Sequence, residues 1–249
     1  PIWLMRQAGR YHHHYQKLKT RYSFMDLCKI PALAAETACG PINDFDFDVA
    51  ILFSDLLFPL EALGMGLTYQ PGPQLSWHLN EKTILKLKPM EEAISHMEFQ
   101  REALQVTRQM LPLDKSLIGF VGGAWTLFGY AVEGSHKGGL KDAKTSWPLF
   151  QSFQQIIIPF LEKNIELQLE GGAEVVLILD TAAGELSPQM FLQVVKPGVE
   201  RLAHKFPGKI GYYSQHTQCA HISPEWLREK NMAGWGFDHR WDLSEIFVH

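Results

Sequence analysis

The stretch that decides the fold is EVVLILDT, residues 174–181, an unbroken apolar run that ends in Asp180 and Thr181. Apolar residues without polar alternation are typical of a strand that is buried on both faces of a parallel sheet. Further runs of strand length that end in polar or glycine residues lie at 2–5, 49–53, 117–121, 209–213 and 235–237. We therefore expect about six strands of one parallel sheet.

Segments with helical spacing lie between these strands. Pro31 precedes a predicted helix at 32–38, and apolar residues recur along one stripe within 90–110 and 150–169. The alternation implies βαβ units, which build either an open doubly wound sheet or a closed barrel. Because no G-x-G-x-x-G motif follows the first strand, the dinucleotide-binding form has no support, and the sequence predicts an α/β fold of the (β/α)8 TIM barrel type.

We expect a single domain over residues 1–249, truncated at both ends and lacking its last barrel units. The segment between 64 and 88 interrupts the barrel pattern. There, 67–69 and 84–87 have strand-like sequences and flank the turn residues 70–73, which predicts a β-hairpin insertion.

Composition narrows the class of protein. The chain has 249 residues, 46% of them hydrophobic and 20% charged, and its 23 Lys and Arg against 27 Asp and Glu give a net charge of −4. This balance predicts no general attraction to nucleic acid or to an anionic membrane. Three widely spaced cysteines and the lack of a membrane-spanning run or signal peptide favour the cytoplasm.

The carboxyl ends of barrel strands normally form the site, so the residues that follow each predicted strand are the candidates. They are Arg6 and Arg10, Ser54 and Asp55, Gly122 and Gly123 with Tyr130 nearby, Asp180 and Thr181, Ser214 and His216, and Asp238 and His239. This set offers arginines, carboxylates and hydroxyls, but no phosphate loop, no nucleophile with a paired base and no compact group of metal ligands. It favours an anionic organic ligand over a nucleotide or a metal.

Three of these residues support the hypothesis of an anionic organic ligand. Arg6 and Arg10 are planar cationic forks that can bind a ligand with several carboxylates, although basic residues near a terminus are usually solvated surface. Asp55 ends the apolar run 50–55, where its carboxylate can accept N–H groups and stabilise a cation. It can equally cap a helix, and spacing alone leaves both roles open.

The sequence also resembles a known family. Residues 1–11, PIWLMRQAGRY, closely resemble the amino-terminal signature of the uroporphyrinogen decarboxylases. Further stretches agree with that family in order, namely 51–56 with 62–65, 123–127 with Tyr130 and 133–134, 180–184 with 186–188, and 236–238. The resemblance covers essentially the whole chain.

This resemblance implies a homodimeric (β/α)8 lyase that uses no metal or organic cofactor. It would decarboxylate the four acetate side chains of uroporphyrinogen III, and the product would be coproporphyrinogen III, an intermediate of haem biosynthesis. The implied catalytic residues are Asp55, Arg6 and Tyr130. The implied substrate-binding residues are Arg6, Gln7, Ala8, Arg10, Phe53, Asp55, Tyr130 and Thr181, with Ile51 on the apolar wall. The aspartate would meet the pyrrole N–H groups at the centre of the macrocycle.

Two departures from the family pattern limit this expectation. The family has a site histidine on its last strand, and the sequence ends before that strand, so we expect these residues alone to be inactive. His12, His13 and His14 stand where relatives commonly show Leu-Pro-Glu, and we interpret them as variable surface sequence and not as a metal site.

Two alternatives remain. His216 and Cys219 fit the zinc ligands of the corrinoid-linked methyltransferases that resemble these decarboxylases, although a polar turn and a buried thiol explain them as well. A noncatalytic tetrapyrrole-binding relative would need the same arginines and Asp55. Bound zinc would indicate the first alternative, and turnover by the full-length protein would exclude the second.

Overall fold

The computed structural model describes residues 2–70, 72–135, 138–242, 244 and 246. Its centre is a five-stranded parallel sheet in the order β1-β4-β5-β6-β7. The strands are β1 (Val49–Ile51), β4 (Ser116–Gly122), β5 (Val175–Asp180), β6 (Ile210–Ser214) and β7 (Met232–Gly236). Adjacent strands of this sheet follow one another along the chain, apart from a separate two-stranded hairpin between β1 and β4. In a doubly wound sheet the order of the strands reverses at one point. The sheet is therefore part of a TIM barrel.

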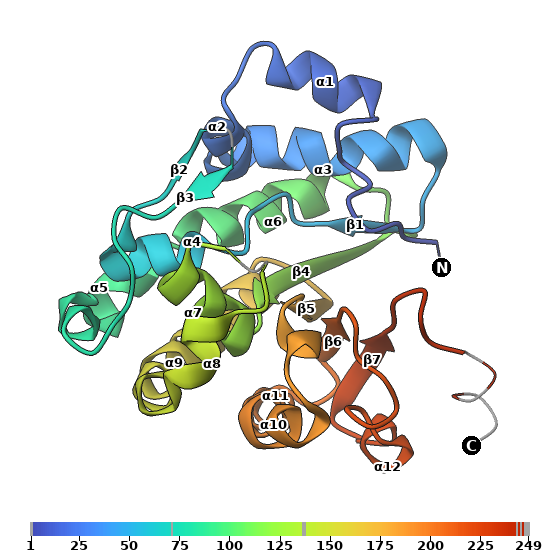
Figure 1. Ribbon diagram of the computed structural model, residues 1–249. Helices are drawn as coiled ribbons and strands as arrows, with labels where there is room; N and C mark the ends of the chain where they lie inside the picture. Colours follow the sequence, from blue (N-terminus) through green and yellow to red (C-terminus); the bar gives the residue numbers. More distant parts are fainter. Residues whose placement is uncertain (1, 71, 136–137, 243, 245, 247–249) are drawn as a thin grey trace.

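Helices cover one side of this sheet (Figure 1). The outer layer consists of α3 (Pro31–Phe45), α6 (Glu98–Met110), α7 (Ala124–Glu133), α9 (Trp147–Glu170), α10 (Pro188–Val194) and α11 (Lys196–Lys205). Within it α3 packs against α6, α6 against α9 and α9 against α11, while α9 also contacts β4 and β5. The main hydrophobic core lies between this layer and the strands, and it includes Phe128, Phe150 and Phe153. The layer thus fixes the outer face of the sheet.

Shorter elements complete the chain. They are α1 (His13–Lys19), α2 (Phe24–Lys29), α4 (Phe58–Leu60), η1 (Glu61–Met65), β2 (Thr68–Tyr69), β3 (Pro73–Gln74), η2 (Thr83–Lys86), α5 (Met90–Ser95), α8 (Lys141–Thr145), η3 (Ala183–Glu185) and α12 (Pro224–Leu227). Local chemistry sets several of their ends. Ser23 and Asp26 form a capping box at α2, and Gly134 ends α7 with φ 71°. No described helix has the length and the apolar sequence needed to cross a membrane.

The amino-terminal strand predicted at 2–5 is wrong. Asp48 N donates to Ile2 O at 3.0 Å, so the segment starts alongside β1. The chain then turns, because Gln7 N donates to Leu4 O at 3.0 Å. One backbone bond with the sheet does not make a ladder, and the apolar residues of this segment form an arm.

The predicted hairpin is only partly correct. Thr68 and Tyr69 pair with β3, so the first predicted strand exists, but its partner is Pro73–Gln74. Residues 84–87 fall largely in the 3-10 helix η2. The long helix expected over 90–110 is likewise divided, because the chain breaks between α5 and α6.

The outer layer contains a buried ionic contact. Glu162 on α9 accepts from Arg201 Nε at 2.6 Å and from Lys205 Nζ at 2.8 Å, both on α11. Burial raises the pKa of Glu162, but the bonds from these two cations outweigh it and hold the pKa below the ordinary 4.5. The contact therefore ties α9 to α11 through an ionised carboxylate.

Glu162→Gln is expected to lower the free energy of unfolding by about 1 kcal/mol near pH 7, because both cations are partly exposed and screened. In the folded protein, the Glu162 carboxylate binds a proton less readily than it does in the unfolded protein. The contribution is therefore complete above pH 4.5 and is lost as pH falls through the lowered pKa. Urea unfolding of both proteins across that range should show the difference disappearing in acid. A difference independent of pH, or equal to that of Glu166→Gln on the same helix, would contradict this assignment.

Candidate functional site

The carboxyl end of β1 presents Ser54 and Asp55 to opposite faces of the sheet. Gln100, on the outer helix α6, donates from Nε2 to Ser54 Oγ at 2.8 Å, so Ser54 points outward. Ala50 and Leu52, at the same alternation, are buried under the helices. Because successive strand side chains alternate, Phe53 and Asp55 face the inner side, which is the barrel interior.

The same alternation separates the two candidates after β5. Asp180 lies on the outer side, where Oδ1 accepts from Thr126 N at 3.0 Å and from Thr126 Oγ1 at 2.5 Å. Tyr212 OH donates to Asp180 Oδ2 at 3.5 Å, and burial raises the pKa of Asp180 to about 6. Asp180 is therefore fastened to α7 and β6, away from the interior. Thr181 follows at the opposite alternation, on the same side as Asp55.

Asp55 lies in a mostly dry setting. Burial raises the pKa of its carboxyl above the ordinary 3.8, while the Leu57 N–H and the Tyr69 hydroxyl lower it and Glu61 raises it again. Leu57 N donates to Asp55 Oδ1 at 2.8 Å, which is an Asx turn. The helix cap considered from sequence is thus half right: Asp55 Oδ1 stabilises the turn before α4, and the carboxylate also interacts with the Tyr69 hydroxyl.

Tyr130 and Arg6 lie at the same end of the barrel as Asp55. Burial and then the Asp55 charge raise the pKa of Tyr130 to about 12, while Arg6 lowers it. The charges of Asp55 and Arg6 both act on Tyr130, so each of them lies on the side of this hydroxyl, although the three residues come from the amino-terminal arm, the segment after β1 and helix α7. Arg6 is exposed and has φ 62°, a left-handed conformation that is uncommon for a non-glycine residue. Such conformations often occur at functional sites.

The turn around Gln7 holds the arginine arm against the sheet. Gln7 is buried, its Nε2 donates to Val49 O at 2.9 Å, and its carbonyl accepts from Tyr11 OH at 2.7 Å. The side chain is thus used inside the protein, and Ala8 beside it is partly exposed. Arg10 is exposed near Tyr15, where it lowers a tyrosine pKa that burial raises.

An aromatic wall borders the region of Asp55. Phe53 packs against Tyr15 with ring centroids 5.6 Å apart and against Phe24 at 6.0 Å. Phe24 packs in turn against Tyr69 at 4.7 Å. The wall combines β1, the helices α1 and α2, and the hairpin strand β2. It gives the inner side an apolar surface next to the carboxylate and the arginines.

Two tyrosines were missed by the sequence analysis. Tyr69 reaches Asp55 from the hairpin, and its buried hydroxyl has no hydrogen bond of normal geometry within the described part of the chain. Tyr213 alternates with the outward-facing Tyr212 and therefore lies on the inner side of β6. Alternation within 209–213 could have indicated Tyr213. No local pattern in the sequence indicates Tyr69.

The polar residues after β6 and β7 form a different arrangement. His216 N donates to Asp238 Oδ2 at 2.8 Å, and this bond helps to lower the pKa of Asp238 although burial raises it. Cys219, the possible zinc ligand, is exposed. Over the described ranges, no three His, Cys, Asp or Glu side chains gather in a way that could hold a metal ion.

The prediction of a variable surface for His12, His13 and His14 is wrong for its first member. His12 is 2% exposed, and its Nε2 lies 2.8 Å from Asp44 Oδ2 on α3. A side chain at Gly40 would overlap the rings of His12 and His14, so this glycine permits the close approach. These histidines therefore pack the amino-terminal arm against α3.

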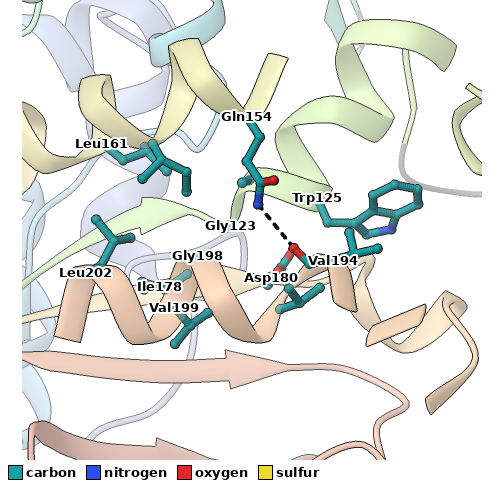
Figure 2. A pocket seen from close by; sticks show the side chains of 13 residues that line it. Gly123, Trp125, Gln154, Leu161, Ile178, Asp180, Val194, Gly198, Val199 and Leu202 are labelled. Carbon is teal, nitrogen blue, oxygen red and sulfur yellow. Dashed lines mark hydrogen bonds between the residues drawn. The ribbon is translucent and has the colours of Figure 1, made fainter. Parts of the chain in front are cut away.

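A small cavity lies on the outer side of the sheet, between β5 and the helices α9 and α11 (Figure 2). Gln154, Asp180 and Val199 are among its lining residues. Its volume of about 10 Å³ leaves room for roughly one water molecule. Gln154 Nε2 donates to Val194 O at 3.3 Å across it. This cavity is separate from the region around Asp55 and is too small for an organic ligand.

Comparison with known families finds a match over nearly the whole chain. The family described as "Uroporphyrinogen decarboxylase (URO-D)" matches residues 1–247. Proteins named uroporphyrinogen decarboxylase are 34% identical in Geotalea daltonii, over 81% of this chain and 61% of the relative, and 36% identical in Chloroherpeton thalassium, over 83% and 62%. One from Thermodesulfovibrio yellowstonii is 35% identical over 87% and 65%. The matches thus span less than two thirds of these relatives.

A solved structure is also similar. A methyltransferase from Methanosarcina mazei superposes with a TM-score of 0.63 at 17% sequence identity, covering 85% of this chain and 66% of that protein. At this identity the similarity concerns the fold alone.

Removing the Tyr69 hydroxyl tests the electrostatics around Asp55. Tyr69→Phe is expected to raise the pKa of Asp55, because it removes a group that lowers this pKa and leaves the burial unchanged. Carbon NMR of the Asp55 carboxyl group during an acid titration measures the change. Tyr22→Phe is the control, and an Asp55 pKa that is unmoved or lowered by Tyr69→Phe would refute the contact.

Proposed function

The chain belongs to the uroporphyrinogen decarboxylase family, and on this premise we propose that the full-length protein removes the acetate carboxylates of uroporphyrinogen III to give coproporphyrinogen III. The observation that carries the proposal is the grouping of Asp55 with Tyr130 and Arg6 at the inner end of β1. A buried carboxylate beside a cationic rim and an aromatic wall suits a ring with N–H groups inside and carboxylates outside.

The arginines bind the rim of the substrate in this proposal. Arg6 and Arg10 are exposed and lie on one short arm, so both guanidinium groups can reach side chains of the same macrocycle. Guanidinium forks bind carboxylates through two parallel hydrogen bonds and stay charged at working pH. Phe53 contributes apolar contact with the ring, and Thr181 and Tyr130 contribute hydroxyls. Gln7 and Ala8 act by shaping the turn between the two arginines.

The substrate supplies the electron sink for the reaction. A proton adds to a pyrrole carbon beside the acetate arm, and the resulting cation accepts the electron pair of the bond that breaks as CO2 leaves. A proton then adds to the remaining methylene carbon, the ring carbon loses its proton, and a methyl group replaces the acetate. Each turn of this cycle consumes one proton and releases one CO2. The chemistry requires no metal or organic cofactor, because the ring does the work that a cofactor does elsewhere.

Asp55 is the proposed stabiliser of the cation. Burial disfavours its negative charge when the site is empty, as the raised pKa indicates. A cation held against the carboxylate compensates that charge in a region of low dielectric constant, where the attraction is strong. Asp55 therefore stabilises the cationic intermediate more than it stabilises the bound substrate. This difference lowers the activation barrier of the reaction.

The remaining properties follow the family. We propose that the protein acts as a single barrel domain, as a homodimer, and in the cytoplasm. Its ligand is a small tetrapyrrole and neither a nucleic acid nor a membrane. Among the residues that the structure describes, no contact around Asp55 favours a zinc-dependent methyltransferase.

Asp55→Ala is expected to lower the rate of coproporphyrinogen formation by about 100-fold to 1,000-fold, because it removes the group that stabilises the cation. An anaerobic assay of the full-length protein on uroporphyrinogen measures it. Near-native turnover in this variant would reject the role of Asp55. A wild-type protein that binds the ring without turnover would instead indicate a noncatalytic relative.

Arg6→Ala is expected to raise KM about tenfold or more, since it removes a charged contact with a substrate carboxylate. The same anaerobic assay, run over a range of uroporphyrinogen concentrations, measures KM. Lys19→Ala on the neighbouring helix α1 is the control for loss of one positive charge. Equal KM values in these two variants would show that Arg6 binds no substrate group.

A further inference from the structure

A chain of buried amides connects the outer helices to the residue beside Asp55. Gln168 on α9 donates from Nε2 to Gln100 Oε1 at 3.0 Å, and Gln100 on α6 donates from Nε2 to Ser54 Oγ at 2.8 Å. Gln168 is 0% and Gln100 2% exposed. The two glutamines thus join three elements that are far apart in sequence, and the chain of bonds ends next to the carboxylate.

The outer end of this chain is fixed to the sheet. Gln168 Nε2 also lies 2.9 Å from Phe120 O and 3.4 Å from Asn164 Oδ1. A side chain at Gly119 would overlap the Gln168 amide, so a glycine on β4 makes room for it. Gln168 therefore has little freedom, and it transmits the position of β4 and α9 to Gln100.

The inner end of the chain supports a segment that the sheet itself does not hold. β1 ends as a ladder at Ile51, and Leu52 N donates to Ile118 O at 3.0 Å. Within the described residues, no later backbone bond joins this segment to β4. Ser54 and Asp55 lie beyond that point. Asp55 is therefore held by its bond to Leu57 N, by its interaction with the Tyr69 hydroxyl and by the contact of its neighbour Ser54 with Gln100.

The amides contribute little net stability for their burial. A hydrogen bond between neutral groups contributes little net stability, and a buried amide that loses its partner costs more than such a bond contributes. Apolar side chains would fill the space between α6, α9 and β4 without that risk. A hydrogen bond, unlike an apolar contact, depends on the direction of the groups that it joins. The amide chain fixes the direction of the Ser54 side chain, and this limits the directions that are open to Asp55, the next residue.

We propose that Gln100 and Gln168 are positioning residues for the decarboxylation: through Ser54 they hold Asp55 toward the interior, where it meets the ring. This inference rests on the proposed function, since it gives the glutamines a role in that reaction. Neither glutamine touches the substrate. Their effect is on the rate of the chemical step, because a small displacement of a catalytic group lowers the rate without weakening the binding of the rim.

Two variants test the positioning. Gln100→Leu keeps the volume and removes both hydrogen bonds, and Ser54→Ala removes only the inner one, so it remains informative if the first variant folds poorly. Each is expected to lower kcat about tenfold with KM within about twofold, and the double variant should be no slower than the slower single one. Gln154→Leu on α9, which loses one hydrogen bond to Val194 O, is the matched control.

A measurement without substrate separates this inference from the proposed function. In both variants the pKa of Asp55, followed by carbon NMR of its carboxyl group, should fall toward 3.8, because a released side chain gains solvent. An Asp55 pKa and a kcat that match those of Gln154→Leu would overturn the positioning role. A wild-type protein without decarboxylase activity would refute the proposed function, whereas the shift in Asp55 would still support the positioning.

Discussion

The site depends on the alternation of side chains at the ends of parallel strands. After β1, Ser54 points to the helices and Asp55 follows on the other side, and at the end of β5 Asp180 points outward and Thr181 follows on the other side. A shift of one residue in either strand would exchange the members of each pair. The buried contacts of the outward residues therefore decide which polar groups face a ligand, although those contacts lie on the opposite side of the sheet.

Burial acts in the same direction on the two aspartates, but their hydrogen bonds differ. It raises the pKa of both, but Thr126 and Tyr212 bind the carboxylate of Asp180, so this group stabilises the joint between α7 and β6. Asp55 accepts from Leu57 N, interacts with the Tyr69 hydroxyl and acts through its charge on Tyr130. A carboxylate that is dry and only partly bonded gains more from an incoming cation than one that is already satisfied. We therefore propose Asp55, and not Asp180, as the carboxylate that takes part in the chemistry.

Sequence patterns predicted the parts of the fold that local physics decides. Unbroken apolar runs located β1, β4, β5 and β6, and spacing located α3 and α9. The run at 2–5 failed because an apolar run becomes a strand only with a partner, and one backbone bond to Asp48 is too few. Residues 84–87 failed for a similar reason, since Pro73–Gln74 pairs with Thr68–Tyr69 first.

The sequence could name candidate site residues by their type, but it could not give their contacts. The sequence indicated Arg6, Asp55 and Tyr130, and in the structure the charges of Asp55 and Arg6 both act on Tyr130. It could not indicate that His12 is buried against α3, nor that Gln100 supports Ser54 from 46 residues away. Such contacts depend on how separate elements pack, and no periodicity within a single element encodes them.

The most direct test of the account is an experimental structure of the full-length protein with coproporphyrinogen bound under anaerobic conditions. The account predicts that the pyrrole N–H groups lie within hydrogen-bonding distance of the Asp55 carboxylate, at about 2.7–3.2 Å, with ring carboxylates on Arg6 and Arg10. A ring bound elsewhere, or bound at this end of the barrel with Asp55 turned toward the helices, would contradict it.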